Sequence, residues 1–233
     1  MKNVKFEDLG IIEYKNAWDY QEEFFAKYLN IKAENRDLTE ENQTEIEGNL
    51  LFCEHPHVYT LGKSGEQNNL LISDEFLNKI QATYVKTNRG GDITYHGPGQ
   101  IVGYPIIDLE RFNLQVKQYI AKLEESIILM LKEFGIESER LQGATGVWLE
   151  TETSRVRKIC AIGVKASRFI TMHGFALNVN TNLEYFNHIN PCGFVNKGVT
   201  SMEKELGEKQ NYEKVKDVLK VKIEQVFGMN LKK

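Results

Sequence analysis

Eleven residues, from Arg89 to Gly99, restrict the fold of this chain more than any other segment, because four of them are glycine and one is proline. This density breaks helices and regular strands, so we expect a loop here. A strand-like apolar run, Ile101 to Leu109, follows directly. Adjacent glycines let a backbone approach a ligand closely, and Thr94 and His96 add polar side chains to Arg89. A structural hairpin is the alternative, but the polar side chains favour a ligand-binding loop.

The spacing of these glycines differs from that of the common phosphate-binding loops. A Walker loop ends in Gly-Lys-Ser/Thr, and a dinucleotide fingerprint needs Gly-x-Gly-x-x-Gly. The segment contains neither pattern. Neither nucleotide-binding motif is therefore predicted.

Hydrophobic periodicity predicts helices and short strands on both sides of the loop. Helices are expected over residues 18–29, 73–80, 113–134 and 212–227, and strands over 49–53, 58–61, 82–87, 101–109, 146–149, 158–164 and 172–179. Ser73 is a suitable N-cap, and Gly135 and Gly228 are suitable helix ends. Several strands lie too close in sequence for βαβ crossovers. Because the chain shows no repeat or interdomain linker, we expect one mixed α/β (α+β) domain over residues 1–233, with its core motifs in 49–200.

The composition is typical of a soluble globular protein. Of 233 residues, 27% are charged and 10% aromatic, and the net charge is −4. The longest purely apolar run, Ile127 to Leu131, is far shorter than the ~20 residues that span a bilayer. Residues 1–8 lack the apolar core of a secretory signal. A mildly acidic chain is also a poor candidate for nucleic-acid binding. We therefore expect no membrane and no nucleic-acid partner.

Positive charge is concentrated in one window, residues 153–183. This window carries +5 and, at a net charge of −4, the remainder of the chain carries −9. The window is either a solvated basic edge or a docking surface for an acidic partner. It holds no acidic residue, and its basic residues are Arg155, Arg157, Lys158, Lys165 and Arg168.

Three widely spaced cysteines, without a Cys-x-x-Cys pair, argue against disulfides and favour a reducing cytoplasm. Cys53 and Cys160 lie in apolar, strand-like runs, where a small buried thiol is the usual outcome. Cys192 lies between Pro191 and Gly193, which predicts a tight turn that presents sulfur to a pocket, with a plain turn cysteine as the alternative. A nucleophilic thiol needs a neighbouring cation or base. The candidates are Lys158, Lys165, His173 and His188, and their spacing does not choose among them.

Cys53, His55 and His57 have the period-2 spacing of three metal ligands on one strand face. Pro56 interrupts a regular strand at this point, and the sequence offers no evident fourth ligand. We therefore expect no metal site.

An ordered set of motifs between residues 54 and 193 resembles that of the lipoyl(octanoyl) transferases. The main motif is Arg89-Gly90-Gly91-x-x-Thr94-Tyr95-His96-Gly97-Pro98-Gly99-Gln100-x-x-Gly103-Tyr104-Pro105. Supporting motifs are Glu54-His55-Pro56-x-Val58-Tyr59-Thr60-x-Gly62, Gly146-Val147-Trp148, Arg157-Lys158-Ile159-Cys160-Ala161-Ile162-Gly163-Val164, His173-Gly174-Phe175-Ala176-Leu177-Asn178 and Asn190-Pro191-Cys192-Gly193. The ordered set is specific to the family, whereas no single motif is.

The resemblance implies a set of site residues. Cys192 matches the cysteine that accepts the acyl group, and Lys158, not Lys165, matches the lysine that lowers its pKa. Asp92 departs from the family pattern, in which an uncharged residue such as glutamine is expected. Contacts to the acyl group are implied for Arg89, Gly90, Gly91, Asp92, Ile93, Thr94, Tyr95, His96, Ala161, Ile162, Gly163, Gly174, Phe175 and Ala176.

The resemblance also implies the fold of the biotin and lipoate protein ligase catalytic domain and a cytoplasmic acyltransferase. Its donor would be octanoyl on the phosphopantetheine of acyl carrier protein. Its acceptors would be lysines on lipoyl domains of 2-oxoacid dehydrogenase complexes and on the glycine cleavage H protein, with no ATP or other cofactor. Two alternatives remain open: an ATP-dependent lipoate or biotin protein ligase, and a non-enzymatic module that binds an acyl chain or a lipoyl domain.

Overall fold

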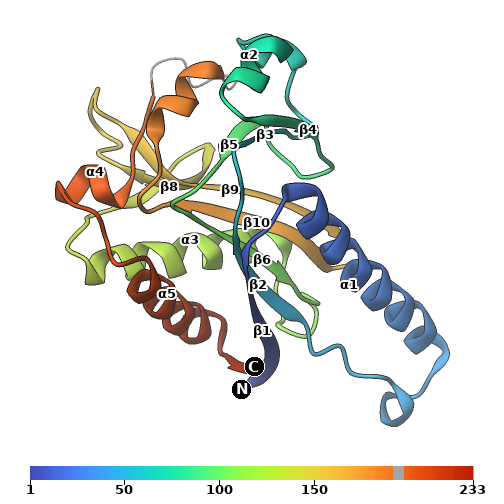
Figure 1. Cartoon of the computed structure of the whole chain (residues 1–233). Coiled ribbons are helices and arrows are strands. Elements are labelled where there is room, and N and C mark those ends of the chain that lie inside the picture. The colour runs from blue at the N-terminus through green and yellow to red at the C-terminus, as the bar shows by residue number, and fades with distance from the viewer. Residues whose placement is uncertain (191–196, 233) are drawn as a thin grey trace.

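A large mixed sheet runs through the middle of the molecule, with helices on both of its faces (Figure 1). The computed structural model describes residues 1–190 and 197–232. The strands of this sheet are β1 (Lys2–Ile11), β2 (Asn49–Glu54), β6 (Gln100–Ile106), β7 (Glu139–Leu141), β8 (Ala144–Leu149), β9 (Arg157–Ser167), β10 (Ile170–Asn178), β11 (Gly198–Val199) and β12 (Met229–Lys232). Their order is β12-β1-β2-β6-β10-β9-β8-β7, and β11 pairs with β9.

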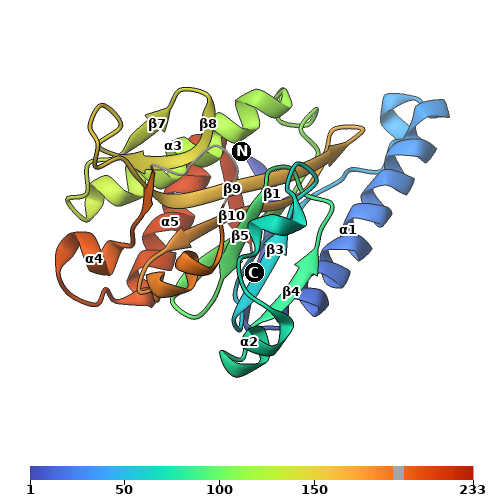
Figure 2. The same cartoon turned by 90° about the horizontal axis from the view of Figure 1, so that it is seen from above.

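Three long helices cover the faces of the sheet. The long helices are α1 (Tyr14–Glu34), α3 (Val116–Glu133) and α5 (Tyr212–Phe227). The short helices are α2 (Asp74–Lys79) and α4 (Met202–Leu206), and the 3₁₀ turns are η1 (Asn35–Asp37), η2 (Glu40–Asn42), η3 (Gln67–Asn69) and η4 (Leu183–His188). The α3 and α5 helices pack together on one face, and α1 contacts β6 and β10 on the other (Figures 1 and 2). No helix in the described ranges is long and apolar enough to cross a membrane.

Side-chain alternation along β6 and β10 divides the apolar residues between two cores. Ile101 and Leu177 belong to the core with α3 and α5, whereas Val102 and Ala176 belong to the core with α1. The α1 face of the sheet therefore presents a second, independent set of side chains, and the cavity described below lies on that face.

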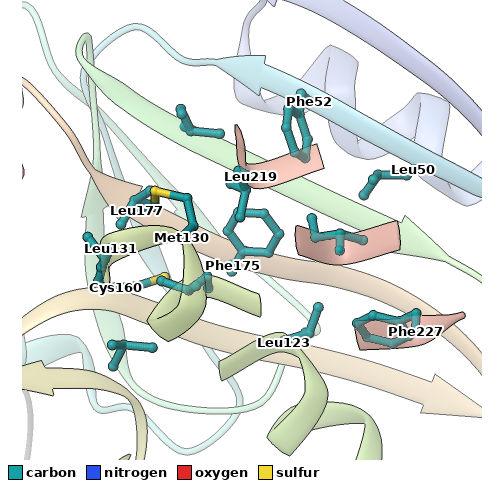
Figure 3. Packing of buried hydrophobic residues seen from close by; sticks show 14 of the residues in the cluster. Leu50, Phe52, Leu123, Met130, Leu131, Cys160, Phe175, Leu177, Leu219 and Phe227 are labelled. Atoms are coloured by element: carbon teal, nitrogen blue, oxygen red, sulfur yellow. The ribbon is translucent and has the colours of Figure 1, made fainter. Parts of the chain in front are cut away.

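The larger core lies between the sheet and the α3–α5 pair (Figure 3). The Phe175 ring lies edge-on to that of Phe52, with centroids 6.0 Å apart. Leu123 from α3 and Leu219 from α5 belong to the same core. Gly103 makes room for this packing, because a Cβ there would lie 2.2 Å from the Phe175 ring. Each such buried side chain contributes about 1.5–3 kcal/mol, so this layer fixes the central strands in place.

A smaller sheet, in the order β4-β3-β5, lies over one end of the molecule (Figure 1). Its strands are β3 (Val58–Leu61), β4 (Thr83–Lys86) and β5 (Ile93–His96). The prediction of an uninterrupted loop over residues 89–99 was wrong, since β5 lies within it and pairs antiparallel with β3. Ile93 and Tyr95 join a buried cluster with Tyr59, and this alternation stabilises a strand between the glycine pairs.

The predicted mixed α/β fold is confirmed, and every expected helix and strand outside that loop is present within a few residues. Ser73 Oγ accepts a hydrogen bond from Phe76 N at the start of α2. Gly228, with φ of 66°, ends α5 in the left-handed conformation that glycine adopts without strain. The edge strand β12 and its neighbour β1 were not predicted, because each is short of apolar alternation and pairs only with residues distant in sequence. The short strands β7 and β11 were not predicted either.

Candidate active site

A cavity of about 840 Å³ lies on the α1 face of the large sheet. Strands β6, β8, β9 and β10 contribute lining residues, as do the glycine-rich segment and η4. Of the residues implied by the resemblance, the cavity is lined by Arg89, Gly91, Asp92, Ile93, Thr94, His96, Lys158, Ala161, Ile162, Gly163, Gly174, Phe175 and Ala176. Residues separated by more than 80 positions in sequence are thus brought together around one space.

Gly90 and Tyr95 do not line this cavity, although contacts were expected from both. Gly90 instead donates its N–H to Val164 O (2.9 Å), which fastens the glycine-rich segment to β9. Tyr95 is fully buried on the opposite face of β5, where its hydroxyl lies 2.7 Å from His57 Nδ1. Strand alternation explains this placement, because Thr94 and His96 occupy the face toward the cavity.

Glycine is required where the glycine-rich segment meets its neighbours. A Cβ at Gly62 would lie 2.2 Å from Gly91 O, and one at Gly163 would lie 2.9 Å from Gly90 O. Lys63 N also donates to Arg89 O (3.0 Å). The segment is therefore held by backbone contacts on two sides, which fixes the roof of the cavity.

The Arg89 guanidinium is buried, with 7% of the residue exposed. Its Nη2 donates to Thr60 O (2.6 Å) and to Thr60 Oγ1 (2.8 Å), and its Nη1 donates to Gly90 O (3.0 Å). Burial lowers its pKa, and the nearby Tyr14, Tyr104 and Asp92 act in the opposite direction. The side chain is thus rigidly positioned in the wall of the cavity.

Asp92 has a structural partner in the η3 turn. The Asn69 amide nitrogen donates to both carboxylate oxygens of Asp92 (2.9 and 3.0 Å), and Ile93 N donates to one of them (2.6 Å). Asn69 is itself buried, and its carbonyl accepts from Asn190 N (2.8 Å). The charge at position 92 is therefore compatible with the glycine-rich segment and connects it to residue 190.

Lys158 is the buried lysine of the cavity. Its ammonium lies over the Trp148 ring, 4.5 Å from the centroid. Burial is the main cause that lowers its pKa, to about 8, with the cations Lys197 and Arg89 acting in the same direction and Cys160 in the other. Near neutral pH both its protonated and its neutral form are populated. Such a group can donate a proton in one step and accept one in another.

The other candidate partners of a nucleophile differ in their surroundings. Lys165 does not line the cavity; it forms an ion pair with Glu22 (3.3 Å) and lies over the Phe25 ring. His188 does not line it either, and its Nδ1 lies 2.8 Å from the Tyr59 hydroxyl. Lys158 and His173 both line it, so two of the four candidates remain at the site.

Cys192 lies outside the described residues. Asn190 and Lys197, the described residues on either side of that segment, both line the cavity. The other two cysteines are buried, as expected, and neither lines the cavity. Burial raises the pKa of both thiols, Cys53 and Cys160, well above the usual value, so both are held protonated.

The Cys53, His55 and His57 side chains do not all meet at one point, although Cys53 Sγ lies 3.5 Å from His55 Nε2. His55 Nδ1 lies 2.7 Å from Ile12 O and its Nε2 lies 2.7 Å from the Tyr104 hydroxyl. His57 stacks on Tyr185 instead, with ring centroids 4.2 Å apart. Across the described part of the chain, no group of three His, Cys, Asp or Glu side chains could hold a metal ion.

Much of the basic window is neutralised by acidic side chains from elsewhere in the fold. Arg157 forms ion pairs with Glu205 and Glu150, each at 2.6 Å, and Arg155 pairs with the same Glu150. Lys165 pairs with Glu22, as described above, and Lys158 is buried in the cavity. Most of these charges therefore serve the fold or the cavity, and the hypothesis of a broad basic docking surface in this window loses its main support.

Some residues that line the cavity were not predicted from the sequence. Tyr14, at the start of α1, lines it and stacks on His96 with ring centroids 5.8 Å apart. Lys197 also lines it, close enough to Lys158 to affect its pKa. Neither has a sequence signal of its own, since one is a helix aromatic and the other an isolated lysine.

Comparison with known proteins places this chain in one family. Residues 13–224 match the lipoyl protein ligase A/B catalytic domain. An octanoyltransferase of Christiangramia forsetii is 53% identical over 99% of this chain and 98% of its own, and one of Flavobacterium psychrophilum is 55% identical over 97% of each. The chain therefore belongs to the lipoyl protein ligase A/B catalytic-domain family and, within it, to the lipoyl(octanoyl) transferases. It is an acyltransferase.

Solved structures with about 11% sequence identity share the fold. A lipoate protein ligase of Thermoplasma acidophilum, solved with its E2 lipoyl domain, superposes with a TM-score of 0.70 over 100% of this chain and 87% of that one. Lipoate-protein ligase A bound with ATP gives 0.69 over 99% and 88% at 10% identity. A biotin protein ligase of Aquifex aeolicus gives 0.52 over 98% and 71%. The predicted likeness to the lipoate and biotin ligase fold is confirmed.

Proposed function

We propose that this protein transfers octanoyl from acyl carrier protein, through a thioester on Cys192, to a lysine of a lipoyl domain. The observation that carries the proposal is the cavity that joins three features: Lys158 with its lowered pKa, the fixed glycine-rich segment, and the two residues that flank the segment of Cys192. The names of the octanoyltransferase relatives supply the acyl group.

The cavity suits a medium acyl chain. Val102, Ala161 and Ala176 give it apolar lining, whereas the Phe175 ring packs in the core on the other face of the sheet. Burial of each methylene contributes about 0.8 kcal/mol. The thioester carbonyl would lie near Lys158, at the end of the cavity that Asn190 and Lys197 also line.

In the first half-reaction, the Cys192 thiol loses its proton to neutral Lys158, and the thiolate attacks the octanoyl carbonyl carbon. The tetrahedral oxyanion collapses, the bond to the phosphopantetheine sulfur breaks, and that sulfur takes the proton from Lys158. Backbone N–H groups of the glycine-rich segment could stabilise the oxyanion. One thioester replaces another, so the step needs no ATP and no other cofactor.

In the second half-reaction, the amine of the acceptor lysine attacks the carbonyl of the octanoyl thioester. Its excess proton passes to Lys158 and then to the departing Cys192 thiolate, which restores the starting state. The amide product is more stable than the thioester, and this difference drives the transfer. Acceptors of this class are the lipoyl domains of 2-oxoacid dehydrogenase complexes and the glycine cleavage H protein, in the cytoplasm.

Mass spectrometry tests the proposal directly. Enzyme mixed with octanoyl-acyl carrier protein should gain the mass of one octanoyl group, and the modified peptide should contain Cys192. Cys192→Ser should lose the adduct, whereas Cys53→Ser and Cys160→Ser should retain it. An adduct on Cys53 or Cys160 would show that the nucleophile is assigned incorrectly.

An ATP-dependent ligase is the second candidate, because ligases share this fold and one was solved with ATP. Against it stands the glycine-rich segment, which has two adjacent glycines where we expect a longer run in a ligase. Incubation of the enzyme with ATP, free octanoate and a lipoyl domain separates the two. Octanoylated product without carrier protein would favour the ligase.

A further inference from the structure

Glu124 is a buried carboxylate on α3, with 7% of the residue exposed. Its Oε1 accepts a hydrogen bond from Gly146 N of β8 (3.0 Å), and its Oε2 accepts one from Arg140 Nε (3.2 Å). The α3 helix contacts β8 (Figure 2). Because an unpaired buried polar atom is costly, this carboxylate holds the Gly146 N–H to the helix.

Gly146 also faces the side chain of Lys158. A Cβ on Gly146 would lie 3.4 Å from Lys158 Cε and 3.5 Å from its Cδ, so the aliphatic part of the lysine passes over this glycine. The same Cβ would lie 2.6 Å from Cys160 O, and the φ of Gly146 is 124°, a conformation that favours glycine. Glu124 and Lys158 therefore lie next to the same backbone position of β8.

Two residues further along β8, Trp148 contacts the lysine ammonium. Lys158 Nζ lies 4.5 Å from the centroid of this ring. Trp148 is 1% exposed, and its Nε1 donates to Ala144 O (3.1 Å). Gly146 lies midway between the two residues that this hydrogen bond joins. A shift of Gly146 would therefore move the tryptophan ring and the lysine together.

We propose that Glu124 is a positioning residue for acyl transfer. By holding the Gly146 N–H, it keeps the aliphatic part of Lys158 over Gly146 and the ammonium over Trp148. Trp148 and Lys158 line the cavity, whereas Glu124 and Gly146 do not, so Glu124 acts through Lys158 and not on the substrate. The inference rests on the transfer proposed above, in which Lys158 moves the protons.

An ion pair is the alternative role for this carboxylate. Arg140 pairs with Glu124 and also with Glu125, whose Oε2 accepts from Arg140 Nη2 (2.6 Å). If the ion pair is what matters, the charge at position 124 is the essential property. If the hydrogen bond from Gly146 N is what matters, the reach of the side chain is essential. Two substitutions separate these properties, because glutamine keeps the reach and aspartate keeps the charge.

Displacement of Lys158 from this position should raise its pKa. Burial is the main cause of its value of about 8, so a lysine that moves toward solvent returns toward the usual value near 10.4. About one tenth of a lysine with a pKa of about 8 is neutral at pH 7, against about one hundredth with a pKa of about 9. The rate of a step that needs the neutral amine should then fall about 10-fold at pH 7 and recover as the pH rises.

NMR titration of the lysine Cε signals measures this pKa without substrate, and the signal of Lys158 is the one that is missing in Lys158→Met. Lys158 should titrate at about 8 in the native protein and in Glu124→Gln. It should titrate above about 9 in Glu124→Asp, whose carboxylate is one methylene too short to reach Gly146 N. Glu125→Asp is the matched control and should keep the native value. A native value in Glu124→Asp, or an equal shift in Glu124→Gln, would overturn the inference.

The pH profile of octanoyl transfer is the second readout. The rate of transfer from octanoyl-acyl carrier protein to a lipoyl domain should be about 10-fold lower in Glu124→Asp than in the native enzyme at pH 7, and this difference should shrink toward pH 10. Glu124→Gln, the conservative variant, should restore the native profile. A loss of equal size at every pH would show that Glu124 serves only the stability of the fold, and would overturn its role in placing Lys158.

The two readouts distinguish this inference from the proposed function. The titration requires no transfer, so the pKa of Lys158 is measurable whether or not the enzyme acylates a lipoyl domain. Variants that titrate as expected in a protein that forms no acyl-enzyme would contradict only the transfer mechanism. Octanoyl transfer by the native enzyme, with the same Lys158 pKa in all variants, would contradict only the positioning role of Glu124.

Discussion

In the proposed mechanism, Lys158 takes a proton from Cys192 in the first half-reaction and returns one to Cys192 in the second. A solvated lysine, with a pKa near 10.4, would remain an ammonium at neutral pH and could not serve as a base. The pKa of Lys158 is lower because the side chain is buried over Trp148 and lies near the cations Lys197 and Arg89. Its pKa of about 8 leaves a useful fraction of the neutral amine. Lys197, whose charge helps to lower the pKa of Lys158, can therefore be tested by substitution.

Lys197→Met should shift the pH profile of octanoyl transfer upward. The Lys197 charge lowers the pKa of Lys158, so its removal raises that pKa, and more alkaline conditions are then needed to populate the neutral base. The measurement is the rate of transfer from pre-formed acyl-enzyme to a lipoyl domain between pH 6 and 10. Lys204→Met is the matched control, because Lys204 lines the cavity but is no cause of the Lys158 shift. Equal profiles in both variants would refute the role of Lys197.

The sequence offered several candidate partners for a nucleophile but could not choose among them. Four cationic or basic partners of Cys192 were open, and two of them, Lys165 and His188, have other partners away from the cavity. What separates Lys158 from Lys165 is burial and an ion pair with Glu22, a residue 143 positions away. Local sequence carries no record of such a pairing. Only the family resemblance selected Lys158.

At the scale of secondary-structure elements, the η3 turn connects the glycine-rich segment with the residues that precede Cys192. Asn69 donates its amide to Asp92, and its carbonyl accepts from Asn190 N. Leu71 N donates to His188 O (2.9 Å), and Leu70 and Ile189 form an isolated bridge. The roof of the acyl cavity and residues 188–190 are therefore parts of one hydrogen-bonded unit.

Asn69→Ala should slow formation of the acyl-enzyme with little change in the KM for octanoyl-acyl carrier protein. The substitution cuts the link from Asp92, so residue 190 is less firmly placed relative to the glycine-rich segment. Small errors in the approach of a nucleophile cost on the order of 10- to 100-fold in rate. Single-turnover kinetics give the acylation rate. Asn68→Ala, at the exposed neighbour, should behave like the native enzyme. An unchanged acylation rate in Asn69→Ala would show that this link does not position the nucleophile.

Elements near this turn also mark where sequence reasoning failed. The density of glycine between Arg89 and Gly99 concealed β5, although Ile93 and Tyr95 have the alternation of a strand. That strand turns Tyr95 away from the cavity and into the aromatic cluster with Tyr59, contrary to the contact expected from the family motif. A motif specifies which residues occur together, whereas the pairing of β5 with β3 decides which of them face the ligand.

At the scale of the whole molecule, the two ends of the chain lie side by side (Figure 1). β1 pairs in parallel with β12, as in the register of Lys2 with Met229, and the same β1 pairs with β2 on its other edge. No periodicity within either segment reveals a partner more than 220 residues away. The long helices were predictable because their stripes are local, while this edge of the sheet depends on the complete chain.

Removal of residues 229–233 should lower the free energy of unfolding and leave octanoyl transfer nearly unchanged. The truncation exposes the β1 edge and removes Met229, which is 2% exposed in the core with α3 and α5. Loss of that burial alone lowers the free energy of unfolding by about 1.5–3 kcal/mol, measurable as a lower urea midpoint. No residue of β1 or β12 lines the cavity, so the KM for octanoyl-acyl carrier protein should change less than about twofold where the protein is folded. Val221→Ala, at an exposed position on α5, is the control for a change outside the core. A truncated protein with the native urea midpoint would show that the paired termini contribute nothing to stability. A truncated protein with native stability but impaired acylation would show that this edge of the sheet is coupled to the cavity.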